Sequence, residues 1–148
     1  MEDQQKPKIK RIQNGAYIKD ERAPTLAQKP RVPSIDISFL DLAKAAAATV
    51  GRVLHKNLEF QGAGFMISSR LFLTNNHVIY DSKDALASLV EFNHELNIMG
   101  HPKPVTRFTL APNGFLLSSS RKDLDFTIVA IGNRVSGKSE LLDFGYCP

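Results

Sequence analysis

From Thr49 onward, apolar residues occur in short runs that are separated by turn-forming residues. Short runs that are rich in β-branched and aromatic side chains are typical of strands. Because there is no helical pattern between most of these runs, they predict an all-β fold, a small antiparallel barrel or sandwich. The six predicted strands are Val50–His55, Gly64–Ser68, Leu71–Thr74, Leu89–Asn93, Arg107–Ala111 and Phe126–Ile131.

Two of these runs indicate how the strands are buried. Val90 and Phe92 alternate with Glu91 and Asn93, and this period of two predicts a strand with one face buried and one exposed. The run from Phe126 is almost continuously apolar, which predicts a strand that passes through the interior.

One short helix is predicted before the strands. The segment from Ser38 is rich in alanine, the best helix former, and Asp36 or Ser38 is placed to cap it. Apolar side chains recur in this segment at helical spacing, which predicts a buried face. That face comprises Phe39, Leu42, Ala43 and Ala46.

Residues 1–33 differ in composition from the remainder. They contain four prolines, few aromatic residues and no apolar periodicity, so we expect a disordered leader. Eight basic and four acidic residues give this leader the whole formal charge of +4 that the chain carries. A basic tail can contact phosphate weakly. Residues 34–148, which carry equal numbers of basic and acidic residues, offer no electrostatic reason to expect a nucleic-acid partner.

Cysteine content and hydropathy exclude several kinds of protein. The chain has one cysteine, Cys147, which excludes an internal disulfide and a cysteine-based metal site. It has no apolar stretch like that of a secretory signal or a membrane-spanning helix. We therefore expect a cytoplasmic protein with no membrane partner.

Two segments carry candidate chemistry. A strand, a tight turn and a second strand deliver His77, a residue type suited to act as a general base. Asp125 lies where a polar turn enters an apolar strand, a place where a carboxylate can orient an imidazole. The two residues lie 48 positions apart, close to the roughly 45 that separate the His and Asp of one serine-protease order. We expect their side chains to lie within hydrogen-bond reach, about 2.6–3.2 Å.

The sequences Gly62-Ala-Gly-Phe-Met-Ile and Leu73-Thr-Asn-Asn-His-Val resemble the first-barrel signature of bacterial trypsin-like serine peptidases, similar to the glutamyl endopeptidase branch. The resemblance covers about residues 48–148. It implies a six-stranded antiparallel barrel, the first of the family's two, with His77 as general base and Asp125 as its orienting partner. Vertebrate-type members have a disulfide cysteine after the histidine, where this chain has Val78.

The nucleophilic serine of that family has no counterpart in this sequence, since no Gly-x-Ser-Gly segment occurs. The resemblance therefore implies the His/Asp half of a serine endopeptidase, ending near the inter-barrel linker. We expect it to be inactive alone and to act on polypeptides once a serine-bearing second barrel packs against it. An isolated half would also expose an apolar face that favours self-association.

Two other functions remain open at the level of the sequence. One is a non-catalytic barrel that serves as a binding module, and the other is a fragment of an HtrA-like stress protease, which also carries Thr-Asn-Asn-His-Val. No cofactor is expected. His94 and His101, with Glu91 and Glu95 nearby, match no compact zinc spacing, so we interpret both histidines as solvated loop residues.

Overall fold

A computed structural model of the chain describes residues 36–147. The predicted leader, residues 1–33, lies outside this range. The described elements are α1 (Ser38–Ala48), β1 (Val50–His55), β2 (Phe60–Met66), β3 (Leu71–Thr74), α2 (Ser82–Leu86), β4 (Ser88–Phe92), β5 (Thr106–Leu110), β6 (Leu116–Ser119), β7 (Phe126–Ser136) and the 3-10 turn η1 (Leu141–Phe144). All six predicted strands are therefore present, and the short elements α2 and β6 are additional.

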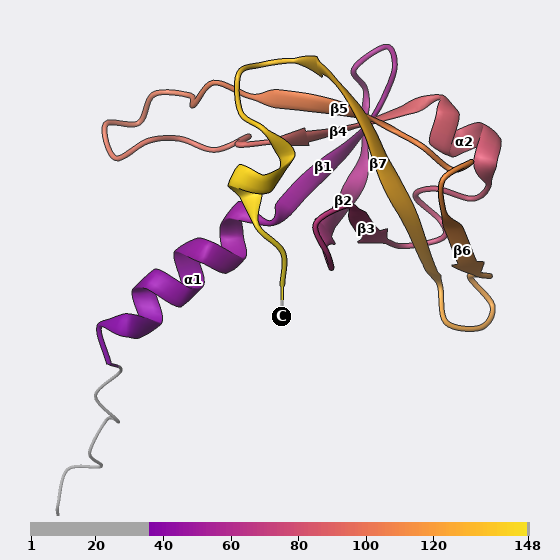
Figure 1. Cartoon of the computed structure of the whole chain (residues 1–148), viewed down its shortest axis with the longest axis horizontal. Helices are drawn as coiled ribbons and strands as arrows, with labels where there is room; N and C mark the ends of the chain where they lie inside the picture. The colour runs from indigo at the N-terminus through magenta and orange to yellow at the C-terminus, as the bar shows by residue number, and fades with distance from the viewer. Residues whose placement is uncertain (1–35, 148) are drawn as a thin grey trace, which may run out of the picture. The chain divides into compact units, whose positions relative to one another are not determined.

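Six of the strands form a closed antiparallel barrel (Figure 1). Its order is β3-β2-β1-β4-β5-β7, and β7 closes the ring by pairing with β3. The length of β7 permits this closure, because its first half pairs with β3 and its second half pairs with β5. β6 pairs with β7 as one outer strand. The fold is thus the predicted all-β barrel, preceded by a short helix.

Aromatic rings fill the interior of the barrel. Phe92 is stacked on Phe144 with 4.4 Å between ring centroids, and Phe72 and Phe108 meet Phe92 edge-on. Phe144 comes from η1, so the C-terminal turn contributes to the core. Gly64 allows Phe72 to approach β2 closely, because a Cβ at this position would lie 2.6 Å from the Phe72 ring. Such packing gives the barrel a rigid wall on which a site can be held.

The prediction that β4 has one exposed face is wrong. All five residues of β4 are buried, including Glu91, whose side chain is 3% exposed. Arg52 on β1 and Arg107 on β5 lie opposite Glu91 in the sheet register, and their side chains cover it. Arg107 Nε donates a hydrogen bond to Glu91 Oε2 at 2.7 Å, and Arg107 Nη2 lies 2.6 Å from the same oxygen in an ion pair.

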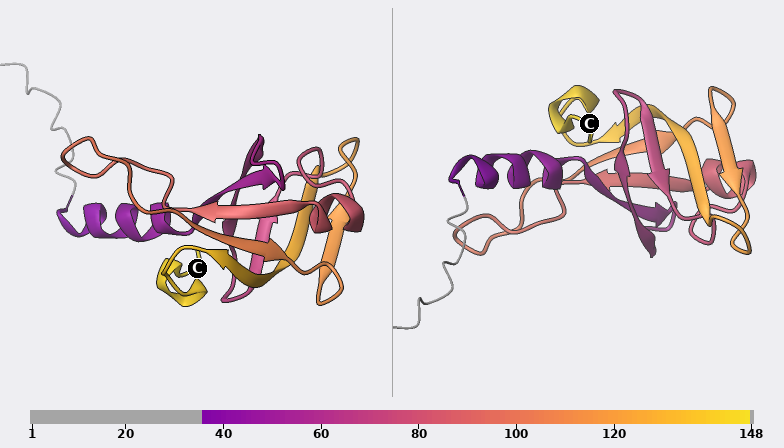
Figure 2. Two further views of the ribbon diagram at one scale, coloured as in Figure 1. Left: turned by 90° about the horizontal axis from the view of Figure 1, so that it is seen from above. Right: turned by 90° about the horizontal axis from the view of Figure 1, so that it is seen from below.

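The helix α1 is present, but its predicted buried face is not. None of its residues is buried, and Phe39 and Leu42 are 54% and 68% exposed. Asp36 Oδ1 accepts a hydrogen bond from the Ser38 amide at 2.9 Å, although neither residue is the N-cap, which is Ile37. Both views in Figure 2 show α1 extending away from the barrel, which explains the exposure. Within residues 36–147, neither helix has the length and apolar character needed to cross a bilayer.

Candidate functional site

His77 lies in a turn that follows β3. The strand ends at Thr74, whose hydroxyl donates to the carbonyl of Ala63 on β2 at 2.8 Å. The chain then turns, because the amides of Val78 and Ile79 both donate to the carbonyl of Asn75. This turn leaves the imidazole half-exposed at the rim of the barrel. The predicted placement of His77 beyond a strand end is confirmed.

Asp125 is the last residue before β7. The polar turn that precedes it is closed by hydrogen bonds from the amides of Asp123 and Asp125 to the carbonyl of Ser120. Asp125 has a φ of 49°, in the left-handed region that aspartate tolerates better than most residues. The carboxylate thus sits at the junction of a polar turn and a strand, as predicted, although the first half of β7 alternates buried and partly exposed residues and does not run wholly through the interior.

The two side chains meet. His77 Nδ1 lies 2.7 Å from Asp125 Oδ2, which confirms the predicted contact. Asp125 Oδ1 also accepts a hydrogen bond from the His77 amide at 3.0 Å. Because an ionised carboxylate only accepts hydrogen bonds, Nδ1 carries the proton of the neutral ring, and Nε2 keeps a lone pair. This arrangement is that of a general base with its orienting carboxylate.

The contacts with His77 also set the ionisation of Asp125. Desolvation acts to raise the pKa of its carboxyl. The hydrogen bonds from the His77 ring and amide, together with Coulombic attraction to His77 and Arg121, outweigh this effect and hold the pKa below its ordinary value. The carboxylate is therefore ionised at neutral pH, when it can stabilise an imidazolium.

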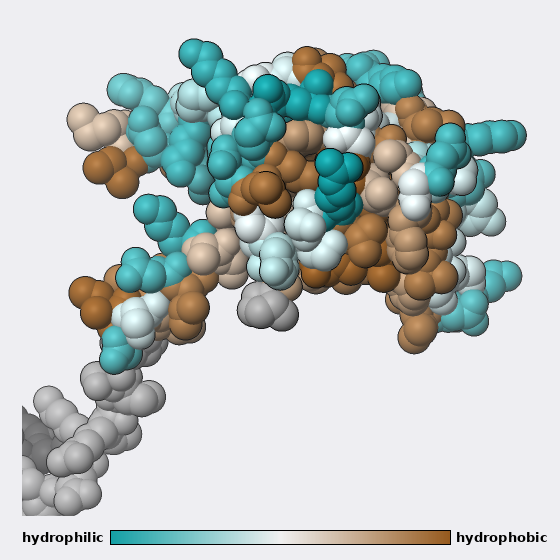
Figure 3. Space-filling model, in the orientation of Figure 1, coloured by the Kyte–Doolittle hydropathy of each residue, from teal (hydrophilic) through white to brown (hydrophobic). Residues whose placement is uncertain are grey.

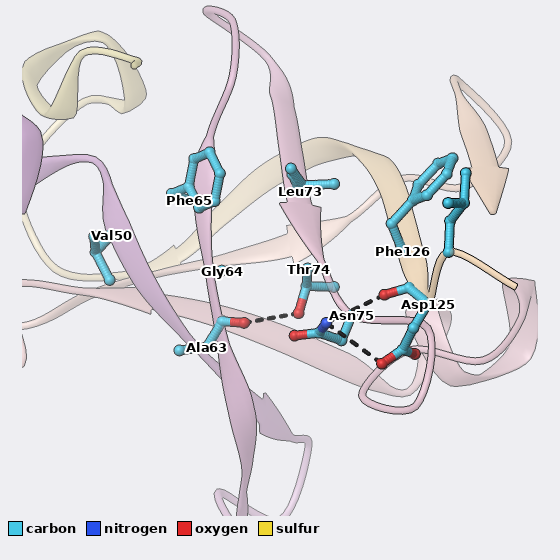
Figure 4. A pocket seen from close by; sticks show the side chains of 10 residues that line it. Val50, Ala63, Gly64, Phe65, Leu73, Thr74, Asn75, Asp125 and Phe126 are labelled. Carbon is cyan, nitrogen blue, oxygen red and sulfur yellow. Dashed lines mark hydrogen bonds between the residues drawn. The ribbon is translucent and has the colours of Figure 1, made fainter. Parts of the chain in front are cut away.

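A groove of about 390 Å³ opens beside this pair (Figure 4). Asn75 and Asp125 line one end, and Figure 4 shows the Asn75 amide directed at the carbonyl and carboxylate of Asp125. The rest of the wall includes the apolar side chains Val50, Phe65, Leu73, Leu124 and Phe126. Figure 3 shows apolar surface over the region of β2, β3 and β7. The site thus combines a polar pair with an adjacent apolar surface.

The described residues supply no nucleophile to this pair. The run of serines Ser118–Ser120 lies in β6 and the turn after it. The Ser120 hydroxyl donates to Asp123 Oδ2 at 2.6 Å, and that of Ser119 accepts from the Leu124 amide. Within residues 36–147, no serine hydroxyl is hydrogen-bonded to His77.

The other histidine candidates do not form a metal site. His94 is exposed, and its Nδ1 lies 3.2 Å from Oε1 of the buried Glu91. In the part of the chain that the structure describes, no group of three or more His, Cys, Asp or Glu side chains is placed to hold a metal ion.

Three residues around the pair have roles that the sequence alone does not predict. Asn75, Asn76 and Thr127 make hydrogen bonds that link the His77 turn to Asp125 and β7. Two consecutive asparagines at a strand end are a turn signal. The sequence does not show which groups the side chains of Asn75 and Asn76 bond to.

Part of the chain is similar to a curated protein. An 86-residue stretch is 48% identical to the uncharacterized protein y4fB of Sinorhizobium fredii (strain NBRC 101917 / NGR234). The match covers 57% of this chain and 13% of that protein, so the chain spans only a small part of the length of the relative. No family model matches the sequence.

Proposed function

We propose that residues 36–147 form the His/Asp half of a trypsin-like serine endopeptidase. The observation that carries this proposal is the double hydrogen bond of Asp125, which accepts from both the ring and the amide of His77. The closed antiparallel barrel is compatible with the first barrel of that family. The wider resemblance rests on the motifs around His77 and Asp125.

The proposed mechanism is acyl transfer. Nε2 of His77 takes the proton of a serine hydroxyl that a second barrel supplies, while the serine oxygen attacks the carbonyl carbon of a peptide. The imidazolium then gives its proton to the leaving amine, which leaves an acyl-enzyme that water hydrolyses. Asp125 holds the reactive tautomer and stabilises the imidazolium throughout.

The groove beside the pair is the proposed contact surface for the serine-bearing barrel. Its wall is mainly apolar, and it adjoins Asp125, so a domain that packed here would exclude water from the carboxylate. Val50 and Leu124, which line it, are both at least half-exposed in the described chain. A partner with an apolar face would bury them.

A fluorophosphonate probe tests the proposal, because it labels only a serine that is activated by a base. We expect no labelling of the 148-residue chain alone. We expect labelling when it is joined to a downstream segment that carries a glycine-framed serine. His77→Ala should then abolish labelling and lower kcat by several orders of magnitude, whereas His101→Ala, which changes an exposed loop histidine, should leave both unchanged.

Two results would contradict the proposal. The first is His77-dependent labelling of the chain alone, for which Ser118–Ser120 are the residues to examine. The second is a joined protein that folds and binds peptide but is never labelled. The second result would favour the alternative of a non-catalytic barrel that binds polypeptides.

A further inference from the structure

Asn76, the residue before His77, is buried although it lies in a turn. Only 3% of the residue is exposed to solvent. Its amide nitrogen donates two hydrogen bonds, at 3.1 Å to the carbonyl of Tyr80 and at 3.2 Å to the hydroxyl of Thr127. The first bond closes the turn on itself, and the second ties the turn to β7.

Thr127 completes the connection from the side of β7. It is fully buried, and its hydroxyl donates to the carbonyl of Ile79 at 2.8 Å. Since the hydroxyl proton is used there, the oxygen can only accept from Asn76. The Tyr80 carbonyl and the Thr127 hydroxyl therefore both accept hydrogen bonds from the Asn76 NH₂ group. Asn76 Oδ1 has no donor among the described residues, so the NH₂ group makes all the hydrogen bonds of this side chain.

These bonds lie on both sides of the His77–Asp125 pair. Thr127 is in β7, two residues after Asp125, and Asn76 directly precedes His77. On the solvent side of the pair, Asn75 Nδ2 donates to the Asp125 carbonyl at 3.1 Å. The backbone on each side of His77 is thus bonded to the backbone that carries Asp125 through contacts within the described residues.

We propose that Asn76 and Thr127 are positioning residues that assemble the His77–Asp125 pair within this chain, before any serine-bearing partner binds. The role of this preassembly in catalysis rests on the proposed function. The preassembly itself follows from the hydrogen bonds alone. A partner would then find the base already oriented. It would need to supply only the nucleophile, the oxyanion-hole donors and the substrate pocket.

The test uses NMR of the full 148-residue chain, with the His77 ring Nδ1–H signal as the readout. We expect a hydrogen-bonded, slowly exchanging ring proton in the chain alone. Thr127→Val keeps the shape of the side chain but removes the hydroxyl. This change should weaken or abolish the ring signal and shift the midpoint of the Asp125 titration upward, toward its ordinary value. Thr127→Ser restores the hydroxyl and should restore both.

Thr109→Val on β5 is the matched control, because it removes a strand hydroxyl whose bonds are to Asn133, away from the pair. It should change neither readout. If Thr127→Val fails to fold, Asn76→Ser provides the same test from the turn, since a serine hydroxyl cannot reach both acceptors. A folded Thr127→Val or Asn76→Ser chain with an unchanged His77 signal and Asp125 midpoint would overturn the proposal.

These readouts separate the two proposals, since neither needs peptidase activity. A preassembled pair in a joined protein that is never labelled would leave the positioning role standing and remove the peptidase. In a joined protein that is active, Thr127→Val should lower kcat by about 10- to 100-fold with little change in KM, as expected for a displaced base. Thr127→Ser should recover the loss.

Discussion

At the scale of single residues, the conformation of Asp125 determines what its carboxylate reaches. Its positive φ turns the chain sharply between the polar turn and β7, and both carboxylate oxygens then face the His77 backbone and ring. Asparagine tolerates the same backbone region. Asp125→Asn is therefore a fair way to remove the charge without straining the turn.

We predict that Asp125 titrates below its ordinary pKa of about 3.9, because His77 stabilises the ionised form. A group with a lowered pKa stabilises the fold above its unfolded-state pKa and loses that contribution as the pH falls through the folded-state value. The difference in unfolding free energy between the wild type and Asp125→Asn should thus shrink as the pH falls below about 4. Carboxyl NMR titration and denaturant unfolding measure the two quantities.

His77→Ala provides the control for this prediction. It removes the ring but keeps the backbone amide that donates to Oδ1, so the Asp125 midpoint should rise toward its ordinary value. A midpoint that is unchanged by the loss of the ring would contradict the assigned cause.

At the scale of elements, the strands were predictable because each is a short apolar run between turn residues. β6 was missed, since its sequence Leu-Leu-Ser-Ser shows neither alternation nor β-branched residues. The exposure of α1 could not be predicted, because helical periodicity shows which residues share an apolar face but not whether another element packs against that face. The burial of Glu91 depends on arginines in two other strands, and only the register brings them together.

Part of the candidate site was predictable from the sequence and part was not. His77 and Asp125 were predictable from local motifs and their order along the chain. The link between Asn76 and Thr127 joins side chains that are 51 residues apart. No local pattern specifies such a bond, and it follows only from the pairing of β3 with β7.

We predict that Glu91→Gln destabilises the barrel by about 2 kcal/mol or more, because it leaves the guanidinium groups of Arg52 and Arg107 without their buried counter-charge. Glu95→Gln is the matched control, since it breaks the exposed pair with Lys103 and should cost less than about 1 kcal/mol. Urea unfolding of the two variants measures the difference. Equal, small effects would show that Glu91 contributes little to the stability of the sheet.

At the scale of the whole molecule, apolar side chains line the groove that adjoins Asp125, and apolar surface is visible over the region of β2, β3 and β7 (Figure 3). We predict concentration-dependent self-association of the chain through this surface, since exposed apolar area favours contact with a partner. Leu124→Glu should reduce it, because Leu124 lines the groove and is 75% exposed.

Leu142→Glu is the control for self-association, since Leu142 is 74% exposed but lies away from the groove. Sedimentation velocity across a range of concentrations measures both variants. A purely monomeric wild type, or equal effects of the two changes, would contradict a role for the groove.

The closing of the barrel by β7 has a kinetic consequence for the site. His77 and Asp125 follow β3 and precede β7, the two strands whose pairing completes the ring. This pairing spans a long stretch of chain, and contacts of high sequence separation tend to form late and slowly during folding. The imidazole–carboxylate contact is therefore expected among the last events of folding. A chain arrested before closure would have most of its strands but no assembled base.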